Sequence, residues 1–296
     1  MAVSNRVHYF HADASAFGGY LERPIEHTIA PQAPMSLSPS GGYGSARSEN
    51  FRLESVVSYK SASSQVSGRL SKKEGRGWVT LASATVEGLN VLDVVTADRL
   101  TAQVSTEHPL EGDNPRVTFL GTSFENLKIA GCPIDIKLNF DICDQGNGNG
   151  YPSQPCIEDD QFLTRVADQY KRMTNEENLP KWVKDRSIPD WIEERYKWDA
   201  KQVEATDSVL CSIVKEAAVK EEDAAKQQAA NETCQFPGRP FGSVFEVPDF
   251  GRVFLGELFV DCNSYRLTTI RLEMGCSGQG SLSGPTAMTN GHTIPP

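Results

Sequence analysis

The sequence predicts a mainly β protein whose β body is interrupted by a helical insertion. Apolar and polar residues alternate with a period of two over much of residues 1–157, a segment with helical spacing follows, and alternation returns after Cys234. A period of two places one face of each strand in a core and the other in water. The chain has 296 residues, 39% of them hydrophobic, so it can bury a substantial core.

Residues 1–157 are predicted to form a β-rich repeat region. The segment EGLNV at 87–91 stands 38 positions after ENFRL at 49–53 and 38 positions before ENLKI at 125–129 (87 minus 49, 125 minus 87). Units that each expose an apolar face bury it by stacking, as in a β-solenoid, or by pairing as the sheets of a β-sandwich. The sequence therefore predicts a repetitive β-sandwich or a β-solenoid-like body and leaves the choice open.

Residues 158–233 are predicted to form the helical insertion. Asp159 and Asp160 favour the first turn of a helix through its dipole, and Ser187 is the expected N-cap of a second helix in the segment SIPDW. The apolar face of the first helix has helical spacing: Phe162, Val166, Tyr170 and Met173. A third helix is expected from another apolar stripe: Val203, Leu210, Ile213, Val214 and Ala217.

Residues 234–276 are predicted to complete the β body as a terminal β-hairpin. The segment GRVFLGELFVDCNSYRLTTIRLEMGC has the pattern of two strands around a turn at Asn263 and Ser264. Residues 277–296 are rich in Gly, Ser and Pro, and we expect them to form a tail or an extended arm.

Composition excludes some classes of function. The formal net charge is -10 and the pI is near 5.1, and we find no cluster of Lys and Arg of the kind that binds nucleic acid. No run approaches the roughly 18 apolar residues needed to span a bilayer. No secretory signal is visible at the start of the sequence. We therefore expect no nucleic-acid partner, no membrane span, and a protein that is cytoplasmic or exported by a route that the sequence does not identify.

The seven cysteines do not form a metal or redox motif, since no CxxC occurs. Cys143 and Cys156 bracket a loop rich in Gly and Asn, and they are a candidate disulfide if the environment is oxidising. Buried reduced thiols are the alternative for this pair. Cys132, in AGCPID, is expected to be a core residue rather than a reactive thiol.

No catalytic, cofactor-binding or metal-binding residues are predicted. His8 and His11 stand three apart, which on a strand points them to opposite faces, so a shared metal site is not expected. The loop DQGNGNG lacks the acidic anchors of a calcium loop, and GxSxG, GxGxxG and P-loop signatures do not occur. No cofactor is therefore expected.

Two groups of residues remain as candidates for contacts. Glu49, Glu87 and Glu125 recur once per unit and are expected at solvated turns, although a ladder of carboxylates that binds cations or sugar hydroxyls is an alternative. Four aromatic residues of the insertion are candidates for an interaction surface, with core packing of the helices as the alternative. They are Trp182, Trp191, Tyr196 and Trp198.

The β segments also carry a family resemblance. FHADASAFGG, VEGLNVLDVVTADRLTAQVSTEHP and IRLEMGC resemble uncharacterised bacterial β-rich proteins and, more distantly, the choice-of-anchor class of surface-associated proteins. The resemblance implies a β-rich fold and association with a surface, and it carries no catalytic residue.

From these observations we expect a non-catalytic structural or assembly protein that self-associates, at a cell surface or in a filament. A polysaccharide-acting enzyme is the first alternative, with acidic residues on one sheet face; the candidates are Glu87, Asp93, Asp98 and Glu125. A carbohydrate-binding module is the second, and it predicts exposed coplanar aromatic residues on the β body.

Overall fold

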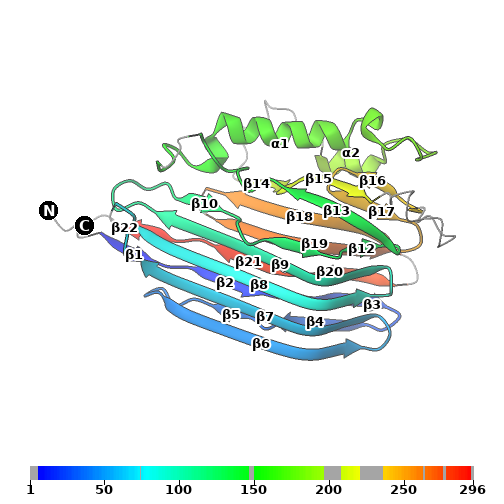
Figure 1. Ribbon diagram of the computed structural model, residues 1–296, viewed down its shortest axis with the longest axis horizontal. Helices are drawn as coiled ribbons and strands as arrows, with labels where there is room; N and C mark the ends of the chain where they lie inside the picture. Colours follow the sequence, from blue (N-terminus) through cyan, green and yellow to red (C-terminus); the bar gives the residue numbers. More distant parts are fainter. Residues whose placement is uncertain are drawn as a thin grey trace, which may run out of the picture.

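The fold is a sandwich of two antiparallel β-sheets with two α-helices along one edge (Figure 1). The computed structural model describes residues 6–73, 75–146, 150–196, 208–220, 236–262, 264–275 and 278–294. The mainly β prediction is confirmed. Every pair of strands in the described residues is antiparallel and the sheets pack face to face, so the sandwich, and not the solenoid, is the architecture of the body.

One sheet, which we call the meander sheet, follows the chain almost in order. Its strands are β6 (Gly42–Leu53), β7 (Val57–Leu70), β8 (Trp78–Val91), β9 (Val95–His108), β10 (Arg116–Thr118), β11 (Ser123–Glu125), β12 (Lys128–Ile129), β13 (Cys132–Leu138) and β15 (Val214–Val219). The four long strands β6 to β9 are joined by short turns, so each strand pairs with its neighbour in sequence.

The other sheet, which we call the composite sheet, is assembled from distant parts of the chain. Its strands are β2 (Ala12–Ser15), β3 (Phe17–Arg23), β4 (His27–Gln32), β5 (Met35–Ser36), β14 (Ser208–Ser212), β16 (Arg239–Phe241), β17 (Val244–Val247), β18 (Gly251–Asp261), β19 (Tyr265–Gly275), β20 (Gln279–Ser283) and β21 (Thr286–Thr289). The remaining strands, β1 (Val7–Tyr9) and β22 (His292–Ile294), pair with each other.

The three segments at the 38-residue spacing lie at equivalent places in the meander sheet, each leading into the turn of a hairpin. Asn50, Gly88 and Asn126 all have a positive φ, at 54°, 65° and 50°. Four residues later the turns contain a second set with positive φ: Glu54 at 48°, Leu92 at 52° and Ala130 at 50°. The sequence period therefore corresponds to one β-hairpin.

The alternation of side chains changes phase beside these residues. In β7, the buried residues are odd-numbered before Lys60 and even-numbered after it: Val57 and Tyr59, then Ala62, Ser64 and Val66. β8 and β9 change phase at the same level, next to Gly88 and Asp98. Because neighbouring strands change together, their pairing register is preserved.

Small residues line the middle of the sandwich, where β2 and β21 of the composite sheet contact β8 and β9. All are almost fully buried: Ala12, Ala14, Ala82, Ala84, Ala102 and Ala287. Side chains of this size let the two backbones approach closely, while larger residues fill the two ends of the core.

The first predicted helix is confirmed as α1 (Asp160–Met173). The Asp159 side chain is its N-cap and accepts hydrogen bonds from the backbone N–H groups of Gln161 and Phe162. The predicted apolar face is buried against the composite sheet. The second helix, α2 (Asp190–Tyr196), begins later than predicted, because Ser187 bonds to the Asp185 carboxylate instead of capping a helix.

The third predicted helix is wrong. Residues 208–219 form β14, which pairs with β18, and β15, which pairs with β13, so the chain crosses from one sheet to the other at the fully buried Ile213. The run VLCSIV has a single polar residue, Ser212, and a short apolar run of this kind fits a buried strand as well as a helix. Val203 lies outside the described residues.

Residues 278–294 do not form a tail. They contain β20 and β21, which pair with β19 and with the N-terminal strands β3 and β2, and then β22. A Cβ atom on Gly280, whose φ is 152°, would lie 2.3 Å from the Tyr20 carbonyl oxygen, so the glycine is required by close packing. β18 and β19 form the predicted hairpin, but residues 236–275 also hold β16 and β17. No described helix has the length and apolar character to cross a membrane.

Candidate functional site

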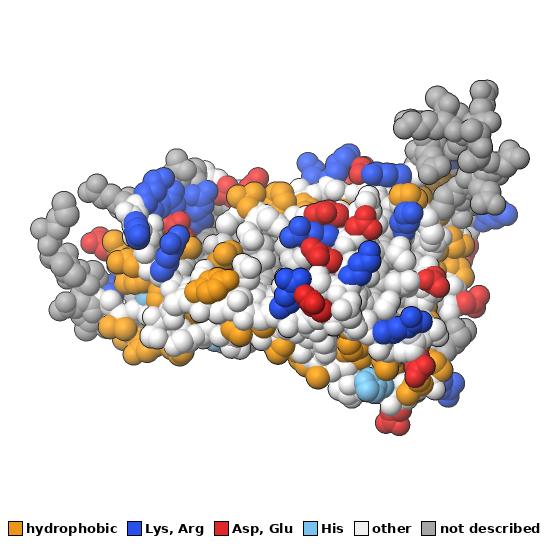
Figure 2. All heavy atoms as spheres, turned by 60° about the horizontal axis from the view of Figure 1, so that its bottom comes forward, with side chains coloured by type: hydrophobic (Ala, Val, Ile, Leu, Met, Phe, Trp, Pro, Cys, Tyr) orange, Lys and Arg blue, Asp and Glu red, His pale blue; other side chains and the backbone are white. Residues whose placement is uncertain are grey.

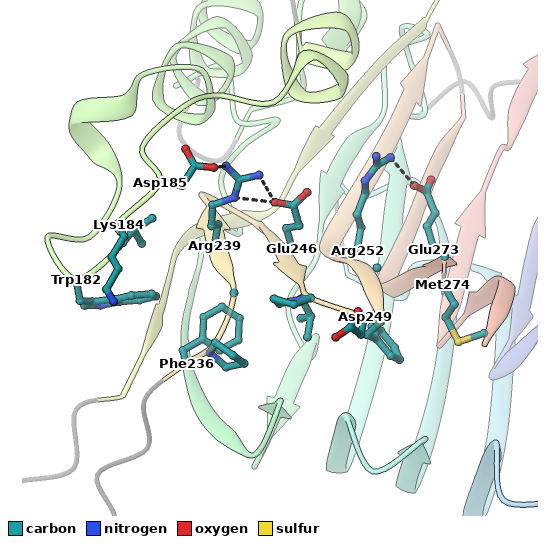
Figure 3. A pocket seen from close by; sticks show the side chains of 18 residues that line it. Trp182, Lys184, Asp185, Phe236, Arg239, Glu246, Asp249, Arg252, Glu273 and Met274 are labelled. Atoms are coloured by element: carbon teal, nitrogen blue, oxygen red, sulfur yellow. Dashed lines mark hydrogen bonds and ion pairs between the residues drawn. The ribbon is translucent and has the colours of Figure 1, made fainter. Parts of the chain in front are cut away.

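A groove of about 1020 Å³ opens where the segment before α2 meets the edge of the composite sheet (Figure 3). Its walls come from residues 182–185, from β16 and the residues before it, and from the ends of β17, β18 and β19. Sequence segments more than 90 residues apart therefore meet in one concave surface, which is where binding sites commonly form.

Charged side chains of alternating sign cross the groove in a single row. The row takes one residue from each of four neighbouring strands, β16 to β19, and each residue lies directly opposite the next. In order they are Arg239, Glu246, Arg252 and Glu273. The closest side-chain atoms of Arg239 and Glu246 are 2.5 Å apart, and Arg252 Nη1 lies 3.4 Å from Glu273 Oε2 (Figure 3). Opposite charges on adjacent strands stabilise a sheet, and here they also fix the polar groups of the groove.

Asp185 extends the row toward the helices. Arg239 Nη1 lies 3.0 Å from Asp185 Oδ2, so one guanidinium joins the segment before α2 to β17. The hydrogen bonds that Ser187 donates, and then the Arg239 charge, hold the pKa of Asp185 below its usual value. Charge-assisted hydrogen bonds thus connect the segment before α2 to the strands that form the rest of the groove.

A second set of ion pairs anchors α2 beside the groove. Arg271 on β19 donates to Glu257 at 2.5 Å and 2.9 Å and also to Glu273. Burial opposes the charge of Arg271, yet its bonds to the two carboxylates raise its pKa above the ordinary value. Arg195 of α2 donates to Glu257 at 3.0 Å, so helix and sheet share this carboxylate.

The opposite side of the groove is apolar. Trp182 is 38% exposed, and its ring meets Phe236 edge to face with 6.0 Å between the centroids. Phe236 is buried and packs in the same way on Phe245 at 5.7 Å. The arrangement offers a ligand one exposed indole on an aromatic base, next to a fixed row of charges.

Comparison with known proteins places this chain in a family. A family model described as a domain of unknown function (DUF8256) matches residues 8–261, which is well over half of the chain. The chain belongs to this family. Neither the curated proteins nor the solved structures contain a match to the DUF8256 chain.

The structure of the DUF8256 chain places the candidate interaction residues in different environments. Trp182 lines the groove. Trp191 does not line it and is half-buried against the charged row. The Arg252 guanidinium lies 4.0 Å from the centroid of the Trp191 ring, and Trp191 Nε1 lies 3.4 Å from Glu246 Oε1. Tyr196 is buried against Tyr170, and burial raises its pKa to about 12. Trp198 lies outside the described residues.

Sequence reasoning did not find the charged row. Each of its four residues stands at an outward position of a strand, and in the sequence each one is an ordinary solvated charge. What brings them together is the register of four strands, and a single sequence shows that register only through turn lengths. The alternation of Arg and Glu over residues 239, 246, 252 and 273 was the available signal.

The candidate disulfide cysteines are neighbours, and in the structure they are free thiols. Cys143 and Cys156 are both buried. Burial, and then the hydrogen bond with the Cys143 thiol, raises the pKa of Cys156. A bridge between them stays a prediction. Cys132 is fully buried, as expected for a core residue, and is disulfide-bonded.

The periodic glutamates lie on one row across the meander sheet, with Ser61 opposite both Glu49 and Glu87, and Arg99 opposite both Glu87 and Glu125. Ser61 Oγ donates to Glu87 at 2.7 Å, and Arg99 Nε lies 3.9 Å from it. Figure 2, which brings the lower edge of Figure 1 forward, shows acidic and basic side chains interspersed in one cluster. The glutamates alternate with other polar residues, and none of them lines the groove.

Proposed function

We propose that the DUF8256 chain is a non-catalytic binding protein whose groove holds an extended segment of a protein partner. The observation that carries the proposal is the exposed Trp182 ring next to a preformed row of paired arginines and glutamates. Trp and Arg are the residue types that most often dominate the binding energy of protein interfaces, with polar groups around them.

The groove carboxylates support binding rather than acid–base chemistry. Glu246 accepts hydrogen bonds from Arg239 and Trp191, and Glu273 accepts from Arg252 and Arg271. Their oxygens are therefore engaged in charge-assisted hydrogen bonds within the protein. A ligand meets a surface whose polar groups are already oriented, which lowers the entropic cost of binding.

Selection from a random peptide display library tests this function. We expect enriched peptides to bind the wild-type chain and to lose at least about tenfold in affinity for Trp182→Ala, since an interface hot spot is worth about 2 kcal/mol. Tyr43→Ala, which removes an aromatic ring that is 69% exposed on β6, is the matched control and should bind like wild type. Peptides that bind Trp182→Ala equally well would contradict the proposal.

A carbohydrate-binding module is the second candidate. The charged row continues through Ser281 to Tyr20 on β3, and the Tyr20 ring is 48% exposed. An aromatic ring on the β body, in line with the groove, is the feature that this alternative needs. A glycan array decides between the candidates: binding that depends on Tyr20 and Trp182 favours carbohydrate, and silence on the array leaves the protein partner.

We also propose that the chain self-associates at a cell surface, in line with its resemblance to choice-of-anchor proteins. The disulfide at Cys132 supports an oxidising environment. Size-exclusion chromatography with light scattering tests assembly: oligomers that grow with concentration are expected, and a strict monomer over a wide concentration range counts against this part of the proposal.

A further inference from the structure

The first and last strands of the described chain form a separate two-stranded ladder at one end of the sandwich (Figure 1). β1 pairs with β22 in antiparallel register, with His8 opposite Thr293 and Tyr9 opposite His292. Three residue pairs are too few to be stable alone. What keeps this ladder in place must therefore be its contacts with the end of the sandwich.

The main contact is an aromatic box around His8. The His8 ring stacks on Trp78 of β8, with 5.2 Å between centroids and 12° between planes, and lies 4.7 Å from Phe10. His108, the last residue of β9, lies 4.6 Å away. Both histidines are buried, with 6% and 2% of their surface exposed.

Two ring nitrogens in the box have no hydrogen-bond partner among the described residues: His8 Nε2 and His108 Nδ1. The other nitrogen of His8, Nδ1, lies 3.0 Å from Thr293 Oγ1 of β22. Gly291 closes the box, since a Cβ atom there would lie 2.9 Å from His8 Nε2. An extra proton would consequently be placed next to apolar groups.

The charges that face His8 are all basic. His108 and His292 each oppose a positive charge on His8. Carboxylates on segments adjoining the box in sequence are paired with other groups: Asp113 with Arg6 at 2.5 Å, Glu107 with Arg76 at 3.0 Å, and Asp13 with His11 at 3.1 Å. A proton on His8 or His108 is therefore penalised by burial and by the neighbouring histidines.

We propose that the histidine box is an acid-sensitive clasp, in which protonation of His8 and His108 releases the β1–β22 ladder from the sandwich. Well above pH 6.5, the usual pKa of histidine, both rings are neutral in the closed and in the open state, so closure does not depend on pH. Below pH 6.5 the two histidines bind protons in the open state but remain neutral in the closed state. The closed state therefore becomes less stable relative to the open state as pH falls, until pH reaches the closed-state pKa values of the two histidines.

The magnitude follows from linkage. Burial, and then the charges of His108 and His292, lower the pKa of His8 to about 3. Burial also lowers the pKa of His108 to about 4, although a backbone hydrogen bond with Gly291 opposes this shift. At pH 5 each histidine therefore shifts the equilibrium toward the open state by about 30-fold, and the two together by about 1000-fold.

Hydrogen exchange of the full chain, followed by mass spectrometry at pH 7.5 and pH 5, tests the clasp. After division by the intrinsic exchange rates, we expect amides of β1 and β22 to exchange up to about 1000 times faster at pH 5. Amides of β7 and β8 should keep their protection. A ratio near one for β1 and β22, or simultaneous loss of protection in β7 and β8, would overturn the proposal.

Variants separate the box from a general effect of acid. His108→Gln removes one titrating group, so the ratio should fall to about 30, and His8→Gln provides the same test if the first variant does not fold at pH 7.5. His27→Gln removes an exposed histidine on β4 and should keep the wild-type ratio. An unchanged ratio in a folded His108→Gln or His8→Gln protein would also overturn the proposal. The clasp does not depend on the groove, so its failure leaves the proposed binding function intact.

Discussion

The two sheets of the sandwich differ in how the chain builds them and in what their outer faces carry. The meander sheet is made of successive hairpins, and its outer face bears serines, threonines and separate exposed ion pairs such as Arg47 with Glu49. The composite sheet combines strands from the beginning, the middle and the end of the chain. Its outer face bears a connected set of ion pairs and the groove, next to the edge along which the helices lie.

This difference suggests that the meander sheet mainly provides stability and the composite sheet mainly provides binding surface. The meander sheet forms local contacts, which cost little loop-closure entropy, and is therefore suited to serve as the stable platform. The composite sheet requires contacts between residues far apart in sequence, and such assemblies are where grooves form from several segments. Function is therefore expected where the topology is non-local.

The largest effect is expected from the core beneath the helices. Phe254 of β18 is fully buried and lies under the guanidinium groups of Arg271 at 3.8 Å and Arg195 at 4.7 Å. Phe254→Ala should lower the free energy of unfolding by about 3–5 kcal/mol, measured by urea denaturation. Leu100→Ala, at a fully buried position of the meander sheet, should cost about 2–5 kcal/mol without disturbing the ion pairs. A loss below about 3 kcal/mol for Phe254→Ala would contradict the importance given to Phe254.

How much of this could be predicted depends on the same distinction. Where the signal is local, the sequence predicted the structure: the alternation in β7 to β9, the hairpin of β18 and β19, and the apolar face and acidic first turn of α1. The 38-residue spacing was also visible, because each hairpin needs positive φ at the same two places. These features depend on residues close together in the chain.

Non-local features were missed for a physical reason. The strands β20 and β21 look like a flexible tail because Gly, Ser and Thr carry little hydrophobic signal, and they are strands because partners on both sides complete their hydrogen bonds. The groove row Arg239, Glu246, Arg252 and Glu273 exists only through strand register. Trp182 could be named as a candidate, but its position on the groove could not.

Ion pairs give the second test of the comparison. Arg271→Met would leave Glu257 and Glu273 next to each other in a partly buried network, at a cost of about 3 kcal/mol. Arg47→Met on the meander sheet is the matched control: it breaks a pair whose side chains are 68% and 54% exposed, so a change within about 0.5 kcal/mol is expected. Urea denaturation of both variants measures the difference, and equal costs would show that the two outer faces are energetically alike.

The smallest expected effect concerns the backbone of the meander sheet. Gly88→Ala should cost about 1–2 kcal/mol, because its φ of 65° is unfavourable for a residue with a Cβ atom. The atoms nearest to the new methyl group belong to the flexible side chain of Lys60, so the cost reports the conformation rather than a clash with backbone. Asn50→Gly, at the equivalent place one hairpin earlier, should change stability by less than about 0.5 kcal/mol, since both residues accept positive φ. Gly275→Ala, where φ is ordinary and the space is open, is the control for the loss of a glycine. If Gly88→Ala were no more costly than Gly275→Ala, the change of side-chain phase across the meander sheet would not depend on the left-handed residue, and the 38-residue spacing would need another physical cause.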